Sequence, residues 1–113
     1  MPARQLHVHG MKSKSDTRTF DVELLALAED ELSDAYDWYE EQQESLGDKL
    51  YYEVNYFLNL LELNPYQFQV RYADDLRAAS LNKFPYLIIF WIDEPNYIIY
   101  VVSIFHTSRN PQF

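Results

Sequence analysis

The last apolar segment of the chain ends in four polar residues, His106, Thr107, Ser108 and Arg109. Histidine changes its charge near neutral pH, so His106 could accept or donate a proton. An arginine binds phosphate through two parallel hydrogen bonds where the geometry allows. The cluster could therefore transfer a proton beside a bound phosphate group.

Earlier residues offer groups of the same kind. Arg71, Arg77 and Lys83 are further cations, and Tyr72 or Tyr86 could stack on a nucleic-acid base or donate a proton. Each candidate also has an ordinary structural explanation. The cations could pair with nearby acids or stay solvated, and the histidine could bond to the backbone at the end of a strand.

The composition indicates one globular domain. Of the 113 residues, 48% are hydrophobic and 17% aromatic, which suits one compact core. The chain has no cysteine, so disulfides, thiolate catalysis and cysteine-bound zinc are excluded. No apolar stretch reaches the roughly 18 residues of a membrane-spanning helix, and no secretory segment begins the chain. We expect a cytoplasmic protein that needs neither a metal nor another cofactor.

The net charge of −9 is unevenly distributed. Residues 21–64 hold thirteen acids and one lysine, a net charge of −12. Residues 1–20 carry +3, and the charges of residues 65–113 cancel. Because affinity for phosphate comes from Lys and Arg, the chain is a poor general binder of nucleic acid. Binding to a phosphate-rich surface would rest on few contacts.

Residues 28–63 have the pattern of two helices. Apolar residues recur at helical spacing from Ala28 to Tyr39, with acids on the remaining face. The segment "SLGD" at residues 45–48 has the spacing of a capping box and predicts a second helix start. Pro65 ends that helix, because proline cannot continue the hydrogen-bond ladder. The short link predicts an antiparallel helical hairpin.

Alternating patterns flank this hairpin. Residues 19–27 predict a short edge strand, and residues 66–72 alternate in the same way. Further strands are expected at residues 76–84, 86–92 and 97–105, the last two joined by a tight turn at "DEPN". We expect an α+β domain in the order β-α-α-β-β-β, its helical hairpin packed on a small antiparallel sheet. The domain should span residues 19–113, after a flexible tail 1–18 whose first ten residues need not be native.

Three segments resemble the RelE/ParE toxin superfamily. They are "ELSDAYDWYEEQQESLGDKL" (residues 31–50), "VRYADDLRAASLNKFPYLIIFWID" (residues 70–93) and "VVSIFHTSRNP" (residues 101–111). The resemblance covers about residues 19–111 and is to the ParE-like branch. It rests on the order of the elements together with R-x5-R-x5-K-F-P-Y, from Arg71 to Tyr86, and the terminal H-x-x-R-x-P.

The resemblance implies a toxin of a bacterial type II toxin–antitoxin module, neutralised by a cognate antitoxin that wraps it. One branch of the superfamily cuts mRNA on the ribosome, and another inhibits DNA gyrase without the nuclease groups. RNA cleavage by a 2′-hydroxyl needs a general base, a general acid and a cation for the developing charge. The catalytic candidates are His106, Arg71 and Arg77. The candidates for binding phosphate or another target are Lys83, Arg109, Tyr72 and Tyr86.

The acidic charge balance favours the gyrase-inhibiting mechanism. A ribosome-dependent mRNA interferase is the alternative, and a non-toxic protein-interaction domain is a third hypothesis. The second helix carries apolar residues beyond one stripe, which predicts a docking surface. Tyr52, Tyr56 and Leu60 are therefore the candidate residues for binding the antitoxin. Self-association through these surfaces or the sheet edges is a further option.

Overall fold

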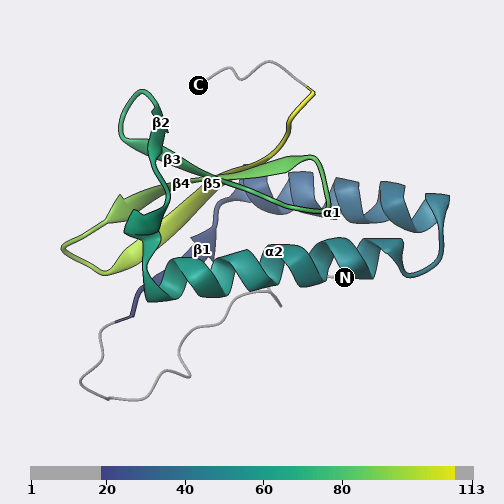
Figure 1. Ribbon diagram of the computed structural model, residues 1–113, viewed down its shortest axis with the longest axis horizontal. Helices are drawn as coiled ribbons and strands as arrows, with labels where there is room; N and C mark the ends of the chain where they lie inside the picture. The colour runs from purple at the N-terminus through teal and green to yellow at the C-terminus, as the bar shows by residue number, and fades with distance from the viewer. Residues whose placement is uncertain (1–18, 109–113) are drawn as a thin grey trace.

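The computed structural model describes residues 19–108, so the predicted tail and Arg109 lie outside the described residues. Two helices lie on one face of a five-stranded sheet, which gives a two-layer α+β fold (Figure 1). The described elements, in chain order, are β1 (Asp21–Leu24), α1 (Ala26–Gln42), α2 (Leu46–Leu63), the 3-10 turn η2 (Pro65–Gln67), β2 (Val70–Tyr72), β3 (Leu76–Ser80), β4 (Tyr86–Asp93) and β5 (Ile98–His106).

The helices α1 and α2 form the expected antiparallel hairpin. On α1 the buried residues Ala28, Leu32 and Ala35 recur at helical spacing, as the sequence predicts. Asn64 ends α2, and Pro65 directly follows as the first residue of the 3-10 turn. Neither described helix combines the length and apolar character needed to cross a membrane.

The turn between the helices differs from the predicted capping box. Ser45 has a left-handed backbone (φ 73°), and its side chain makes no capping hydrogen bond. Instead, Glu40 of α1 accepts from the amides of Ser45 (3.2 Å), Gly47 (2.8 Å) and Asp48 (3.3 Å). A carboxylate from one helix therefore satisfies orphan N–H groups at the start of the next. Gly47 is buried there, and a Cβ in its place would lie 2.7 Å from the carbonyl oxygen of Tyr36.

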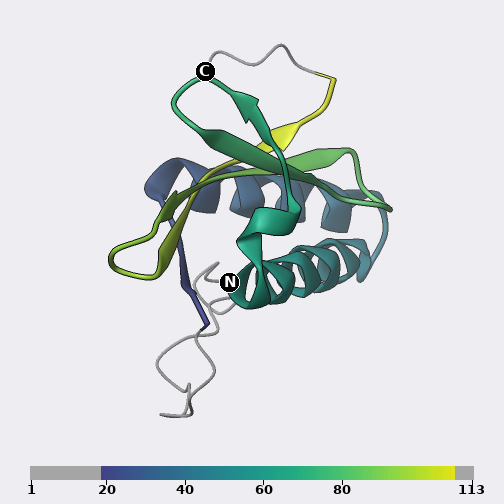
Figure 2. The same ribbon diagram turned by 60° about the vertical axis from the view of Figure 1, so that its left-hand side comes forward.

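The sheet has the strand order β1-β5-β4-β3-β2. The strands from β2 to β5 form the expected antiparallel meander, but β1 pairs with β5 in parallel. The sheet is thus mixed, because one of its strand pairs is parallel and the others are antiparallel. Each of the four segments predicted to alternate or extend after the hairpin contains a strand, so the sheet has one strand more than the order β-α-α-β-β-β gives. Figure 2 shows the β2–β3 hairpin rising from the sheet on the side away from the helices.

The central strand β4 is buried on both faces. Ile88 and Phe90 belong to the main core that the sheet shares with the helices. Leu87 and Ile89 belong to a smaller cluster with Phe105, which has Tyr72 and Leu76 packed against it. The pairing of β4 with β5 shifts register at Ile89 and Phe90. This irregularity lies before the end of β5 that carries His106.

Candidate functional site

The end of β5 holds His106 in a defined orientation. His106 pairs with Tyr86 in the sheet, and the two rings meet edge to face with centroids 5.0 Å apart. The amide of Ser108 donates to Nδ1 of His106 (3.2 Å), and the Ser108 hydroxyl lies 2.6 Å from the same nitrogen. Because Nδ1 accepts the amide proton, the neutral ring carries its own proton on Nε2.

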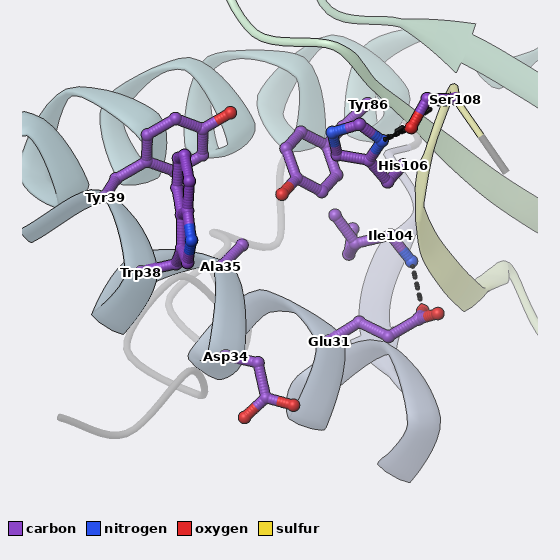
Figure 3. Close-up of a pocket in the computed structure, with 9 residues that line it drawn as sticks. All are labelled: Glu31, Asp34, Ala35, Trp38, Tyr39, Tyr86, Ile104, His106 and Ser108. Atoms are coloured by element: carbon purple, nitrogen blue, oxygen red, sulfur yellow. Dashed lines mark hydrogen bonds between the residues drawn. The ribbon is translucent and has the colours of Figure 1, made fainter. Parts of the chain in front are cut away.

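His106 borders a cavity of about 420 Å³ between α1 and the end of β5. We call it the α1–β5 cavity (Figure 3). It is lined by Glu31, Asp34, Ala35, Trp38 and Tyr39 from α1, Tyr86 from β4, Ile104 and His106 from β5, and Ser108. The five α1 residues lie at positions i, i+3, i+4, i+7 and i+8, so one face of the helix forms this wall.

Glu31 fixes the β5 side of the cavity. Its Oε1 accepts from the hydroxyl of Ser103 (2.7 Å) and from the amide of Ile104 (2.9 Å). β1 pairs with β5 only up to Val101, so this carboxylate covers the sheet edge where β1 has ended. The fully buried Ser103 thereby gains a partner from α1, 72 residues earlier in the chain.

Aromatic side chains form the opposite end of the cavity. Trp38 is 54% exposed, and its ring meets that of Tyr39 edge to face with centroids 5.0 Å apart. Figure 3 shows the indole edge-on, with Tyr39 on one side and with Tyr86 and His106 across the cavity on the other. One face of the indole is therefore turned toward the cavity.

The candidate arginines lie elsewhere. Arg77 pairs with Phe90, whereas His106 pairs with Tyr86, four residues earlier on β4. At about 3.3 Å per residue, this places the two positions roughly 13 Å apart along the strand alone. Arg71 is exposed on the edge strand β2. The strand register therefore separates Arg77 from His106.

Arg77 has structural partners of its own. Its Nη1 donates to the carbonyl oxygen of Phe68 (2.7 Å), and its guanidinium lies 5.3 Å from the centroid of the Tyr66 ring. Tyr66 in turn donates to Glu94 (2.6 Å), and this hydrogen bond raises the pKa of Tyr66. The guanidinium thus belongs to a local network near the β4–β5 turn.

The remaining candidates are also scattered. Tyr86 is buried and contacts Tyr39 and His106 on the helix side of the sheet, whereas Tyr72 packs against the cluster on the other face. Lys83 is exposed in the β3–β4 connection, beyond the end of the strand β3 that carries Arg77. Within residues 19–108, no group of three or more His, Asp or Glu side chains could hold a metal ion.

Lys83 instead lines a second hollow, beside α2, of about 800 Å³. We call it the α2 groove; it is lined by Leu46, Lys49, Tyr52, Glu53, Tyr56, Asn82, Lys83 and Phe84. Tyr52 and Tyr56 are 78% and 57% exposed, and Leu60 is half-buried one turn further along. The candidate antitoxin-binding residues thus lie together on one stretch of α2.

Glu53 shapes this groove. Its carboxylate accepts from the amides of Asn82 (2.9 Å) and Lys83 (3.0 Å), which ties the β3–β4 connection to α2. The carboxylate is engaged by the backbone, so Lys49 and Lys83 are the charged side chains that the groove presents to a partner. The groove therefore combines exposed tyrosines with positive charge.

The sequence analysis missed Glu31, Asp34 and Trp38. A signal for Trp38 was present, because it falls outside the apolar stripe of α1 that Leu32, Ala35 and Tyr39 share. An exposed tryptophan is unusual and favours a binding surface. No local pattern could have shown that Glu31 reaches β5.

Two helices on one face of this mixed sheet agree with the fold of RelE/ParE toxins. The sequence matches the family described as "ParE toxin of type II toxin-antitoxin system, parDE" over residues 22–111. The chain belongs to this family of type II toxins, and membership implies a cognate antitoxin.

A solved structure supports the fold. It is described as "Chromosomal ParDE TA system from P. aeruginosa" and superposes with a TM-score of 0.68. Its chain is 16% identical to this one, and the match covers 77% of this chain and 95% of that chain. No curated protein matches the sequence significantly.

Proposed function

We propose that this type II toxin acts in the cytoplasm by binding a protein target, DNA gyrase, and that it does not cleave RNA. One observation carries the proposal: the strand register holds His106 and Arg77 about 13 Å apart along β4. General acid–base catalysis needs its groups within hydrogen-bond reach of one reacting centre. A cation that far from the proton-transfer group cannot stabilise the charge formed there.

The surroundings of His106 support the same conclusion. Glu31 and Asp34 line the cavity that His106 borders, and the described lining residues include no lysine or arginine. Carboxylates beside the imidazole would repel a phosphodiester, and repulsion is stronger in a partly enclosed site. A mechanism based on protein contact does not meet this obstacle.

The α2 groove is the surface that we assign to the antitoxin. Tyr52 and Tyr56 expose large aromatic rings at a four-residue spacing, and a helix or extended segment could lie along them. Tyrosines of this kind often dominate binding energy at interfaces. Lys49 and Lys83 at the rim would pair with acidic residues of the bound segment.

Induced expression in bacteria tests the mechanism. Wild type, His106→Ala and Arg77→Ala would be compared for growth, transcript integrity and the DNA-damage response. We expect growth arrest and a DNA-damage response with intact transcripts, and His106→Ala should remain toxic. Cut transcripts that become intact in His106→Ala would instead support the mRNA interferase. Absence of arrest in the wild type would leave a non-toxic interaction domain.

The antitoxin surface has a separate test. The cognate antitoxin would be titrated against wild type, Tyr56→Ala and Tyr100→Ala. Tyr100 is half-buried and stacked on Trp91, on β5, away from the α2 groove, so its variant is a control. We expect Tyr56→Ala to weaken binding about 30-fold or more, with Tyr100→Ala unchanged. Equal affinity in all three proteins would contradict the assignment.

A further inference from the structure

The proposed function assigns no ligand to the α1–β5 cavity. It is separate from the α2 groove, with which it shares no lining residue. Glu31 and Asp34 line it, and the described lining includes no lysine or arginine. Such a cavity attracts a cation and repels an acidic or phosphorylated group.

Its shape and its aromatic wall narrow the choice of cation. The Trp38 and Tyr39 rings meet edge to face, and one face of the indole is turned to the cavity (Figure 3). A planar guanidinium stacks on such a ring more readily than a compact ammonium does. It also pairs with a carboxylate through two parallel hydrogen bonds. An aromatic face beside a carboxylate is therefore typical of an arginine-binding site.

The two carboxylates differ in their availability. Oε1 of Glu31 is engaged by Ser103 and by the amide of Ile104, so Glu31 serves mainly to hold β5. Asp34 lies one turn further along α1 and is exposed. Asp34 is thus the carboxylate that an incoming guanidinium can reach.

Size and long-range charge favour one side chain from a basic segment. A volume of about 420 Å³ is near the lower end of ligand pockets, so it accommodates a side chain but not a helix. Residues 21–64, which include α1, carry a net charge of −12. A field of that sign attracts a basic partner and speeds its association.

We infer that the α1–β5 cavity takes an arginine side chain of the cognate antitoxin, its guanidinium stacked on Trp38 and paired with Asp34. The inference rests on the proposed function, because it adds a second contact to the antitoxin complex. The α2 groove binds the amphipathic part of the antitoxin, and the cavity anchors a basic part. The partner of an acidic toxin of this kind therefore carries a basic segment.

The cavity itself can be tested on the isolated chain. Nα-acetyl-arginine amide would be titrated while the indole N–H signals of Trp38 and Trp91 are followed by NMR. Trp91 is stacked on Tyr100 outside the cavity, so it is an internal control. We expect a saturable shift of the Trp38 signal only, and none with the neutral citrulline analogue. Equal shifts of both tryptophans, equal shifts with citrulline or no shift at Trp38 would overturn the inference.

Variants connect the cavity with the antitoxin. Asp34→Asn should weaken binding of the arginine probe about two- to fivefold. Asp34→Asn and Trp38→Ala should each weaken binding of the antitoxin about fivefold or more. Asp37→Asn is the matched control, because it removes the same charge from an exposed position of α1 that does not line the cavity. Both test residues are exposed, so unchanged circular dichroism will show that the variants fold.

The outcomes separate the two claims. If the cavity variants bind the antitoxin as tightly as wild type, the inference is wrong and the proposed function stands. If wild type binds the arginine probe but no antitoxin, the proposed partner is wrong. If Asp37→Asn weakens antitoxin binding as much as Asp34→Asn does, the effect is one of general charge, and the inference about the cavity is wrong.

Discussion

Replacing Glu31 with alanine should loosen the end of β5. The carboxylate of Glu31 accepts from the hydroxyl of the fully buried Ser103 (2.7 Å) and from the amide of Ile104 (2.9 Å). Removing it leaves both donors without this acceptor at a sheet edge that β1 does not reach. The end of β5 then loses two hydrogen bonds to α1.

The size of the effect follows from these two contacts. A hydrogen bond to a charged group contributes about 1.5–3 kcal/mol, but Glu31 is only half-buried, so water can replace part of the loss. We expect Glu31→Ala to lower the free energy of unfolding by about 2–3 kcal/mol. Glu31→Gln keeps an acceptor oxygen and should lose only about 1 kcal/mol.

Urea denaturation of Glu31→Ala, Ser103→Ala and the double variant measures this contribution. Two residues in contact should show a coupling energy of about 1 kcal/mol. Asp30→Ala is the control, because Asp30 is exposed on the same helix and its loss should change stability by less than about 0.5 kcal/mol. A Glu31→Ala protein as stable as the Asp30 control, or strictly additive effects in the double variant, would refute the reasoning.

Three further predictions concern the helical hairpin. Gly47→Ala should destabilise the fold by about 1–3 kcal/mol, because its Cβ would lie 2.7 Å from the Tyr36 carbonyl oxygen; a more stable variant, as helix propensity alone predicts, would contradict this. Glu40→Gln should lower the free energy of unfolding by about 1 kcal/mol and speed hydrogen exchange of the Gly47 amide, whose bond to Glu40 is 2.8 Å long. The hydrogen bond from Tyr36 to Asp48 raises the pKa of Tyr36 from 10.0 to about 12, so its contribution to stability should be complete below pH 10 and lost as the pH rises through 12. An NMR titration of the tyrosine rings checks this, and an Asp48→Asn variant in which Tyr36 still titrates near 12 would show that the cause is wrong.

The sequence predicts much of the fold, because hydrophobic periodicity and proline act locally. The apolar spacing from Ala28 to Tyr39 and the stop at Pro65 give both helices, which extend over Ala26–Gln42 and Leu46–Leu63. The alternation at residues 66–72 overestimates the second strand. There Asn64 accepts from the amide of Tyr66 (3.1 Å) and favours a 3-10 turn before the short β2. Side-chain capping of this kind competes with strand formation.

Contacts between distant segments could not be predicted from periodicity. The parallel pairing of β1 with β5 joins Val22 with Ile99, which are separated by the whole helical hairpin. The same holds for Glu31, whose partner Ser103 lies 72 residues later. The distance between His106 and Arg77 could not be predicted for a related reason. It is fixed by the register of two strand pairs, β3 with β4 and β4 with β5.

The most direct test of the central claim uses purified components. Supercoiling of plasmid DNA by DNA gyrase would be measured with and without this protein, next to an mRNA translated by purified ribosomes under the same conditions. The account predicts that supercoiling is inhibited, that the mRNA stays intact, and that the antitoxin reverses the inhibition. Cleavage of the mRNA with unimpaired supercoiling would contradict it.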